Sequence, residues 1–439
     1  MSTDSDNFIH WFRAAAPYIH SHRGKSFVLH FGGELIDSAE FPHLIHDIAL
    51  LNSLGIRVVI VYGARPQIER LLSEKNIQPK LVSGLRLTDG KTLETVKQAV
   101  GSLRIQIEAL LSMGLPNSPM AQAGIRVSSG NFVNARPKGV IDGIDLEFTG
   151  SVRRIDAESI RTNLDNHEIV LISPLGYSLT GEVFNLSSIE VATQTAISLH
   201  ADKLIFLMSE TVYKDAKGEF IELLSEEQAG ILLKGKVIHD GSVYAPLAAG
   251  LQASRKGVAR IHFINQGRDG SLMQELFSRD GVGTMLTDLP FDDLRTATID
   301  DIGGILELIQ PLEEKGVLVR RSREKLEMEI DDYTVLIRDG TVIACAALHV
   351  YPGETAAELA CVVVHEDYQN MDRGEDLYLK VESDAMTKGV RKLFVLTTQA
   401  THWFLEQGFV EAGVEDLPVA KKELYNYQRN SKVLVKNLR

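Results

Sequence analysis

One stretch of the sequence combines a carboxylate with a site suited to an anionic ligand. Glu358 begins it, and the continuously apolar residues 359–364 that follow are typical of a strand covered on both faces. The polar turn at residues 369–374 then leads into a helix, so free backbone N–H groups and the positive end of that helix meet at one point. Such a point binds phosphate. A carboxylate at the start of the strand could take a proton from an amine.

The turn resembles the acetyl-CoA motif of the GNAT acetyltransferases, which reads Gln/Arg-x-x-Gly-x-Gly/Ala. Gln369 and Gly374 fit this motif, whereas Asp372 stands where its first glycine is usual and would face pyrophosphate. On the turn alone, an ordinary strand-to-helix connection is an equal alternative. The resemblance implies acetyl-CoA as co-substrate and no metal. It also implies that acetyl-CoA is held by Cys361, Val362, Val363, Gln369, Arg373, Gly374 and Glu375.

Length and composition limit the classes of protein to consider. A chain of 439 residues predicts two or three domains, and a net charge of −13 argues against a broad nucleic-acid or membrane surface. Cys345 and Cys361 lie in apolar runs, so we expect two buried thiols rather than a disulfide or a nucleophile. The N-terminus lacks an apolar signal core, and no run is long enough to span a bilayer. We therefore expect a cytoplasmic protein.

Strand and helix patterns alternate through the first two thirds of the chain, which predicts an α/β parallel sheet with helices on both faces. The expected strands are residues 26–31, 56–62, 168–172, 203–207 and 258–264. Residues 123–151 have the glycines and short alternating segments of a β-hairpin excursion. Residues 8–22 predict an amphipathic helix, kinked at Pro17, that packs either on another subunit or on its own domain.

Residues 20–287 resemble the amino-acid kinase fold. The resemblance rests on Phe31-Gly32-Gly33, Tyr62-Gly63-Ala64-Arg65-Pro66-Gln67-Ile68, residues 84–89 and residues 275–284. The kinase turn carries a lysine that holds the transferring phosphoryl group, and here His30 stands in its place. Ala64 and Arg65 replace two glycines of the second turn, which crowds the approach of phosphate. We conclude that this domain has kept the fold and lost the kinase reaction, and by analogy that it acts as a sensor.

A boundary near residues 287–293 divides the chain into residues 1–287 and 288–439. Expected strands at 334–338, 342–348, 359–364 and 392–396, with the helix after the turn, resemble the GNAT fold. An amino-acid kinase-like domain followed by a GNAT domain resembles the bacterial N-acetylglutamate synthase family. Residues 316–322, 344–348, 403–409 and 425–434 also match that family. The resemblance implies acetyl transfer from acetyl-CoA to L-glutamate, the first step of arginine biosynthesis, inhibition by L-arginine, and a homohexamer.

Acetyl transfer to an amine requires a base, a stabilised oxyanion and a proton for the departing thiolate. Glu358 is the candidate base, and a solvated strand-end carboxylate is the alternative. A bulge in the strand at residues 361–363 could free a backbone N–H group for the oxyanion. The family resemblance places the proton donor at Thr397, with neighbouring Thr398 as a rival.

Two basic clusters could hold a small dicarboxylate, because guanidinium binds carboxylate in a bidentate manner. One cluster contains Arg320, Arg321 and Arg323, and the other contains Arg429. A solvated basic face is the alternative. The family resemblance implies that Leu318, Arg320 and Arg429 hold glutamate. Strand phase decides whether Arg320 or Arg321 points inward, and we choose Arg320.

The resemblance also implies a pocket for L-arginine in the first domain. The resemblance places Tyr18 and the segment with Glu275 and Gly281 in this pocket. From their chemistry we add His262 as a further polar contact and Lys203 as a partner for the ligand carboxylate. A carboxylate at Glu275 can pair with a guanidinium. Two other functions compete with this interpretation: an acetylglutamate kinase with an appended acetyltransferase, and a sensor that binds acetyl-CoA without turnover. His30 argues against the first, and only Asp372 favours the second.

Overall fold

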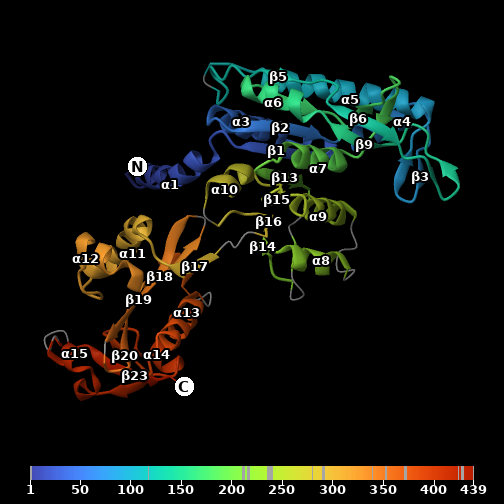
Figure 1. Ribbon diagram of the computed structural model, residues 1–439. Coiled ribbons are helices and arrows are strands. Elements are labelled where there is room, and N and C mark those ends of the chain that lie inside the picture. The colour runs from blue at the N-terminus through green and yellow to red at the C-terminus, as the bar shows by residue number, and fades with distance from the viewer. Residues whose placement is uncertain are drawn as a thin grey trace. The chain divides into compact units, whose positions relative to one another are not determined.

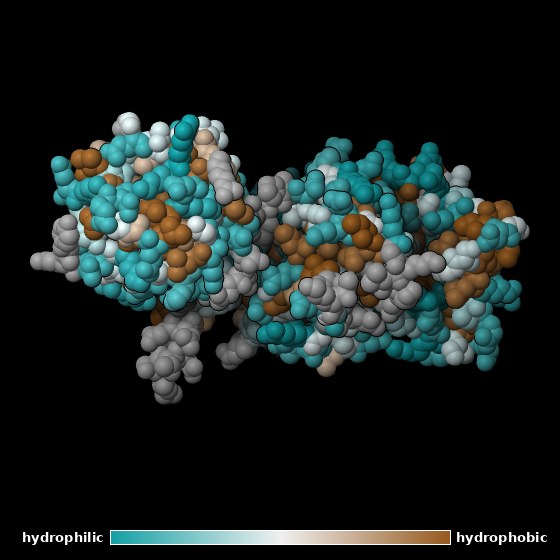
Figure 2. Space-filling model, turned by 90° about the horizontal axis from the view of Figure 1, so that it is seen from below, coloured by the Kyte–Doolittle hydropathy of each residue, from teal (hydrophilic) through white to brown (hydrophobic). Residues whose placement is uncertain are grey.

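The computed structural model describes residues 2–116, 118–209, 213–214, 218–234, 241–278, 280–288, 292–338, 340–351, 353–369, 373–423, 425–426 and 430–438. The chain divides into two compact units, Met1–Leu289 and Pro290–Arg439 (Figure 1). Asp372 and Arg429, both singled out above, lie outside the described residues. Within the described part of the chain, no helix is long and apolar enough to cross a membrane. The face in Figure 2 is mostly hydrophilic, with apolar residues gathered in separate patches.

The first unit is built on an eight-stranded sheet with the order β14-β16-β15-β13-β1-β2-β10-β5. Neighbouring strands are parallel except β15 and β16, so the expected parallel sheet is present. The strands are β1 (Ser26–Phe31), β2 (Arg57–Tyr62), β5 (Val127–Ser128), β10 (Ile169–Ile172), β13 (Lys203–Met208), β14 (Leu223–Leu224), β15 (Arg260–Asn265) and β16 (Thr284–Leu286).

Helices cover both faces of this sheet. Leu29 and Val28 are neighbours in β1 but belong to two different core clusters, because side chains alternate across a strand. Helices α3, α4 and α5 contribute to the first cluster, and α6, α7 and α9 to the second. The helices are α1 (Ser2–His22), α2 (Gly33–Ile36), α3 (Phe41–Ser53), α4 (Arg65–Glu74), α5 (Gly90–Leu111), α6 (Ala157–Asp165), α7 (Ser188–Leu199), α8 (Glu226–Lys234), α9 (Gly241–Ser254) and α10 (Ser271–Phe277). Pro17 lies inside α1.

The excursion expected at residues 123–151 is more extensive than a hairpin. A four-stranded sheet with the order β12-β11-β6-β9 joins it to residues as far as 185. Its strands are β6 (Val133–Pro137), β9 (Gly150–Ile155), β11 (Leu175–Tyr177) and β12 (Val183–Asn185). Two short hairpins complete the unit: β3 (Lys80–Val82) with β4 (Leu85–Leu87), and β7 (Val140–Ile141) with β8 (Ile144–Asp145).

The second unit is a seven-stranded sheet with the order β17-β18-β19-β20-β21-β23-β22. Only the central pair, β20 and β21, is parallel. The strands are β17 (Asp292–Thr296), β18 (Tyr333–Arg338), β19 (Thr341–Tyr351), β20 (Ala356–Val364), β21 (Lys392–Thr397), β22 (Val410–Ala412) and β23 (Lys432–Asn437). The helices are α11 (Ile302–Glu314), α12 (Arg323–Met328), α13 (Arg373–Thr387), α14 (Thr401–Glu406) and α15 (Val419–Glu423), with 3-10 turns η1 (Ile299–Asp301), η2 (Ile330–Asp332), η3 (Glu366–Tyr368) and η4 (Val414–Asp416).

Candidate active site

The sheet of the second unit opens at its centre, where β20 and β21 diverge. The two strands pair only at residues 356–358 of β20 and 392–394 of β21. From residue 359 onward, β20 therefore has no strand beside it on that edge. Backbone N–H and C=O groups exposed in this way can bind an extended ligand as if it were another strand.

β20 also carries the expected bulge. Ala360 pairs with Ala347 of β19, but Cys345 pairs with Val363, so β20 has one residue more than its partner. The extra residue is Cys361, whose φ of 51° is unusual for a residue other than glycine. A bulge takes its extra residue out of the ladder, which makes a backbone N–H group available to a ligand. The bulge follows Glu358 by three residues.

Glu358 is the third residue of β20, and its buried side chain excludes the alternative of a solvated strand-end carboxylate. Lys421 Nζ donates to Glu358 Oε2 at 2.7 Å, and the Tyr351 hydroxyl donates to the same oxygen at 3.4 Å. Burial, followed by the Glu358 carboxylate, raises the pKa of Tyr351 well above its usual value, so this hydroxyl keeps its proton. Lys421 was not predicted from the sequence, because it lies 63 residues away on α15.

Thr397, the candidate proton donor, ends β21 and begins the connection to α14. Its Oγ1 accepts hydrogen bonds from the backbone N–H groups of Gln399, at 3.3 Å, and Ala400, at 3.0 Å. Accepting two bonds leaves the hydroxyl proton available to donate. Phe394, three residues earlier, pairs with Glu358, so Thr397 lies about 10 Å further along the strand. Thr398 is exposed to solvent.

The turn between β20 and α13 keeps part of the expected anion site. Gln369 Nε2 donates to the Val364 carbonyl at 3.1 Å, which closes the start of the turn. The Arg373 guanidinium lies over the Tyr368 ring, 4.5 Å from its centroid. Gly374 and Glu375 are in the first turn of α13, a helix of 15 residues whose first N–H groups can bind an anion.

Of Arg320 and Arg321, it is Arg321 whose charge interacts with Cys361 of the bulge. Residues 317–322 form no strand, so their side chains do not alternate between two faces as the strand phase argument assumed. The Arg320 side chain is exposed. Burial acts to lower the pKa of Arg321, but Cys361, Tyr333 and other nearby acidic groups outweigh it and raise that pKa above its usual value. Leu318 packs partly buried against the core cluster that contains Cys361.

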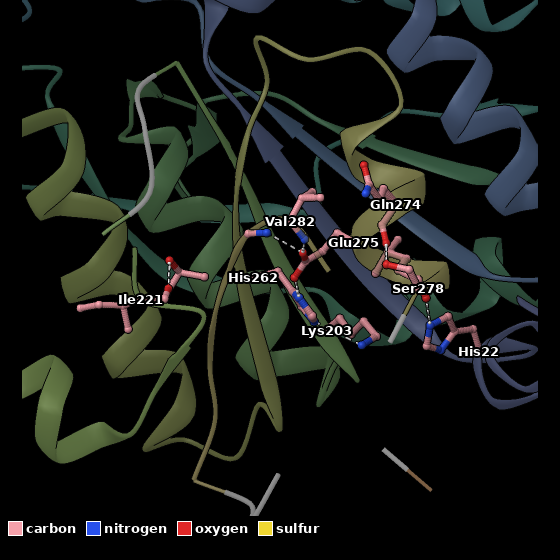
Figure 3. A network of polar contacts seen from close by, with 11 residues as sticks. His22, Lys203, Ile221, His262, Gln274, Glu275, Ser278 and Val282 are labelled. Carbon is pink, nitrogen blue, oxygen red and sulfur yellow. Dashed lines mark hydrogen bonds and ion pairs between the residues drawn. The ribbon is translucent and has the colours of Figure 1, made fainter. Parts of the chain in front are cut away.

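The five residues expected to bind arginine meet in the first unit, and Figure 3 shows the polar network at their centre. Lys203 Nζ lies 3.2 Å from His262 Nε2, and His262 Nδ1 lies 2.6 Å from Glu275 Oε1. Burial and then the Lys203 ammonium lower the pKa of His262, which makes the ring neutral. The neutral ring therefore accepts from Lys203 through Nε2 and donates to Glu275 through Nδ1.

Both oxygens of Glu275 accept hydrogen bonds in this network. Its Oε2 accepts from the backbone N–H groups of Val282 and Gly283, each at 2.7 Å. Burial acts to raise the pKa of Glu275, but the hydrogen bonds from His262, Val282 and Gly283 outweigh it, so the pKa lies below its usual value. Gly281 has a φ of 64°, and a Cβ atom there would collide with the Glu275 carboxylate.

Aromatic contacts connect Tyr18 of α1 to the same network. The rings of Tyr18 and His22 lie 6.3 Å apart, and those of His22 and Phe27 lie 5.3 Å apart. Lys203 Nζ is 5.7 Å from the centroid of the Phe27 ring. His22 Nε2 is also 2.8 Å from the Leu276 carbonyl, which joins the end of α1 to α10.

The turns that resemble the kinase site line a cavity of about 380 Å³ at the carboxyl ends of β1 and β2. His30 lies in its wall, with Nε2 3.0 Å from Ser188 Oγ. Burial lowers the pKa of His30 to about 3, so the ring is neutral at pH 7. The position that carries a fixed positive charge in the kinases therefore carries none here. Among the described residues, no group of three or more His, Cys, Asp or Glu side chains could hold a metal ion.

Comparisons with known proteins match both units. Residues 25–265 match the amino acid kinase family, and residues 304–409 match the acetyltransferase (GNAT) family. The chain is 51% identical to the amino-acid acetyltransferase of Proteus mirabilis, over 100% of this chain and 99% of that protein. It is 50% identical to that of Serratia proteamaculans, over 100% of both chains.

A solved structure extends this likeness to the three-dimensional fold. The N-acetylglutamate synthase from Neisseria gonorrhoeae, complexed with coenzyme A and L-arginine, has a TM-score of 0.87 and 36% identity. The match covers 98% of this chain and 99% of that one. The complex of the same enzyme with coenzyme A and N-acetyl-glutamate has a TM-score of 0.61. The predicted fold class, an amino-acid kinase-like sheet followed by a GNAT sheet, is confirmed.

Proposed function

Because this chain belongs to the amino-acid acetyltransferase family, we propose that it transfers the acetyl group of acetyl-CoA to the amine of L-glutamate. The products are N-acetyl-L-glutamate and CoA. The observation that supports this proposal most directly is the position of Glu358, a buried carboxylate at the point where β20 and β21 diverge. A general base belongs beside the thioester, and the bulge at Cys361 lies three residues further along the same strand.

In the proposed reaction, glutamate arrives as an ammonium and Glu358 takes a proton from it. The free amine attacks the thioester carbonyl, and a backbone N–H group at Cys361, Val362 or Val363 stabilises the oxyanion that forms. The C–S bond then breaks as the amide forms. Thr397 protonates the departing thiolate, and its hydroxyl proton is available for that step. The attacking nitrogen loses its second proton as the amide forms, and this proton restores the Thr397 hydroxyl directly or through water.

We assign acetyl-CoA to the open edge of β20 and to the turn before α13, through Cys361, Val362, Val363, Gln369, Arg373, Gly374 and Glu375. The first N–H groups of α13 suit its pyrophosphate. We assign the carboxylates of glutamate to Leu318, Arg320 and Arg429. Arg321 is a further candidate, since it lies beside Cys361 in the structure.

Residues 1–287 form, in this proposal, a domain that binds L-arginine and inhibits acetyl transfer by residues 288–439. Inhibition of the first step of arginine biosynthesis by its end product is the regulation that this arrangement suits. The buried network of Lys203, His262 and Glu275 supports a site for a ligand that carries both charges. Arginine can inhibit only if it favours a conformation or assembly with poorer catalysis. The neutral His30 supports the loss of phosphoryl transfer.

We also propose that the protein is a cytoplasmic homo-oligomer, with a hexamer as the expected size. Helix α1 supports this, because Phe8, Trp11 and Phe12 leave a large part of their apolar surface exposed. Phe8 and Phe12 stack at 6.0 Å on one side of the helix. A second copy of the chain could cover that surface.

Thiol release from acetyl-CoA, measured over a panel of L-amino acids with and without L-arginine, tests the function. We expect turnover with glutamate, little with other amino acids, and a decrease with arginine. Acetyl-CoA binding without thiol release would support the sensor instead. ATP turnover with N-acetyl-L-glutamate would support a retained kinase.

A further inference from the structure

Glu358 receives both of its hydrogen bonds on one oxygen atom. Lys421 Nζ and the Tyr351 hydroxyl donate to Oε2, at 2.7 Å and 3.4 Å. The described residues supply no such donor to Oε1. The side chains of Lys421 and Glu358 are only 22% and 9% exposed, so this is a largely buried ion pair. A surface ion pair contributes little, whereas a buried one fixes geometry strongly.

The segment just before Lys421 is anchored to the rest of the unit. Leu417, just before α15, is buried in a cluster with Phe394, the residue that pairs with Glu358 across β20 and β21. The N–H group of Val419 donates to Glu354 Oε1 at 3.1 Å, and that of Lys421 donates to the Pro418 carbonyl at 2.9 Å. The short helix α15, which is anchored at its start, therefore places Lys421 beside β20.

The Tyr351 side of the contact is equally constrained. The ring of Tyr351 packs against Phe394, with centroids 5.7 Å apart, and belongs to the same cluster as Leu417. The raised pKa of its hydroxyl keeps it a donor at every physiological pH. Two fixed donors of different chemistry therefore converge on the same oxygen.

We propose that Lys421 is a positioning residue for the base: together with Tyr351 it fixes Glu358 Oε2 and leaves Oε1 to accept the proton of the amine. This inference rests on the proposed function, in which Glu358 is the base. Lys421 itself takes no part in bond making.

His349 is the residue of β19 opposite Glu358, but it is bonded elsewhere, because its Nδ1 lies 3.2 Å from Asp332 Oδ2. Among the described residues, the donors to Glu358 are Tyr351, also on β19, and Lys421 on α15.

The test compares Lys421→Met and Lys421→Arg by kcat and KM for glutamate, with acetyl-CoA affinity measured separately. We expect Lys421→Met to lower kcat about 10- to 100-fold through the misplaced base, with little change in the KM for glutamate. Lys421→Arg, which keeps a charged donor at this position, should restore most of kcat. Acetyl-CoA affinity should stay unchanged.

A matched control is Lys380→Met, which breaks a comparable ion pair with Asp384 on α13, at 2.6 Å and 38% and 30% exposed. It should not change kcat. In the double variant Glu358→Gln, Lys421→Met, the lysine change should cause little further loss, because residues that act as a unit are not additive. If Lys421→Met does not fold, Tyr351→Phe should lower kcat by less, again without a change in acetyl-CoA affinity.

Two outcomes would overturn the role of Lys421. One is an unchanged kcat in Lys421→Met while Glu358→Gln is impaired, which leaves the proposed function standing. The other is a full additional loss in the double variant. If Glu358→Gln itself retains full turnover, the proposed base fails, and the role of Lys421 fails with it.

Discussion

Each unit contains a buried glutamate, and the two are bonded in different ways. Counted as whole residues, Glu275 in the first unit and Glu358 in the second are 8% and 7% exposed to solvent. Glu275 accepts three hydrogen bonds spread over both oxygens, from His262, Val282 and Gly283. Glu358 accepts two, both on Oε2. Burial alone therefore does not distinguish a carboxylate that binds from one that can react.

The number of free lone pairs distinguishes them. An ionised carboxylate offers about four acceptor positions, so Glu275 has about one left and Glu358 about two, both on Oε1. Glu275 is thereby held charged and fixed, which suits recognition of a cation by a single added hydrogen bond. Glu358 keeps one whole oxygen for a proton, which suits general base catalysis.

The most direct way to break this comparison is Glu358→Gln. An amide cannot take the proton, so kcat should fall about 10²- to 10⁴-fold, while acetyl-CoA affinity stays nearly unchanged. Raising the pH should restore part of the rate, because free amine accumulates. Initial rates of thiol release across a pH series provide the measurement. A loss of only about two-fold would remove Glu358 from the role of base.

Glu275→Ala tests the other half of the comparison. Arginine inhibition should disappear, a change of about 5- to 150-fold in the effect of arginine, while acetyl transfer without arginine is retained. The two N–H groups at Val282 and Gly283 lose their acceptor, so the unit should also lose about 1–3 kcal/mol of stability. Calorimetric titration with L-arginine decides the outcome. Undiminished binding in a folded variant would place the pocket elsewhere.

Removing the arginines one at a time sharpens the assignment of the acceptor site. Arg429→Ala should raise the KM for glutamate about ten-fold or more and leave that for acetyl-CoA unchanged, because a substrate carboxylate loses its partner. Arg320→Ala should have a comparable effect if Arg320 turns inward when glutamate binds. Arg321→Ala is the matched comparison, because its side chain already lies beside Cys361. A larger effect for Arg321 would transfer the role to it.

The smallest expected effect concerns stability rather than turnover. Burial lowers the pKa of His30 from 6.5 to about 3, so between these values the unfolded chain binds more protons than the folded one. The contribution of His30 to the free energy of unfolding is fully present above pH 6.5. It is lost as pH falls towards 3, by up to about 1.4 kcal/mol per pH unit. Denaturant unfolding of the parent protein and His30→Gln should therefore show a shallower pH dependence for the variant.

The contribution of Asp47 to stability changes with pH in the opposite direction to that of His30. The variant must therefore be compared with the parent protein. Burial, then Asp269, raises the pKa of Asp47 to about 6, so its contribution decreases as pH rises from 3.8 to 6. Both proteins contain Asp47, and its effect cancels in their difference. Identical pH profiles for the two proteins would contradict a buried neutral His30.

The sequence alone was sufficient to predict features that depend on a single segment of the chain. The strand at residues 359–364 is continuously apolar because both of its faces are covered, and β20 contains all of it. The order of the two folds was predicted from the family resemblance of residues 20–287 and 288–439, which rests on several short motifs. The four-stranded sheet of β6, β9, β11 and β12 was missed in part, because two of its strands have only three residues each.

Tertiary structure decided the partners of the functional residues. Lys421 reaches Glu358 across 63 residues, and Lys203 reaches His262 across 59. Arg321 rather than Arg320 lies beside Cys361 because their segment is irregular, so its side chains follow no fixed alternation. The periodicity of a segment predicts which of its sides is buried, but it does not predict which other segment covers that side. That choice is made only when segments distant in the chain pack together, since the free energy of each contact depends on both partners.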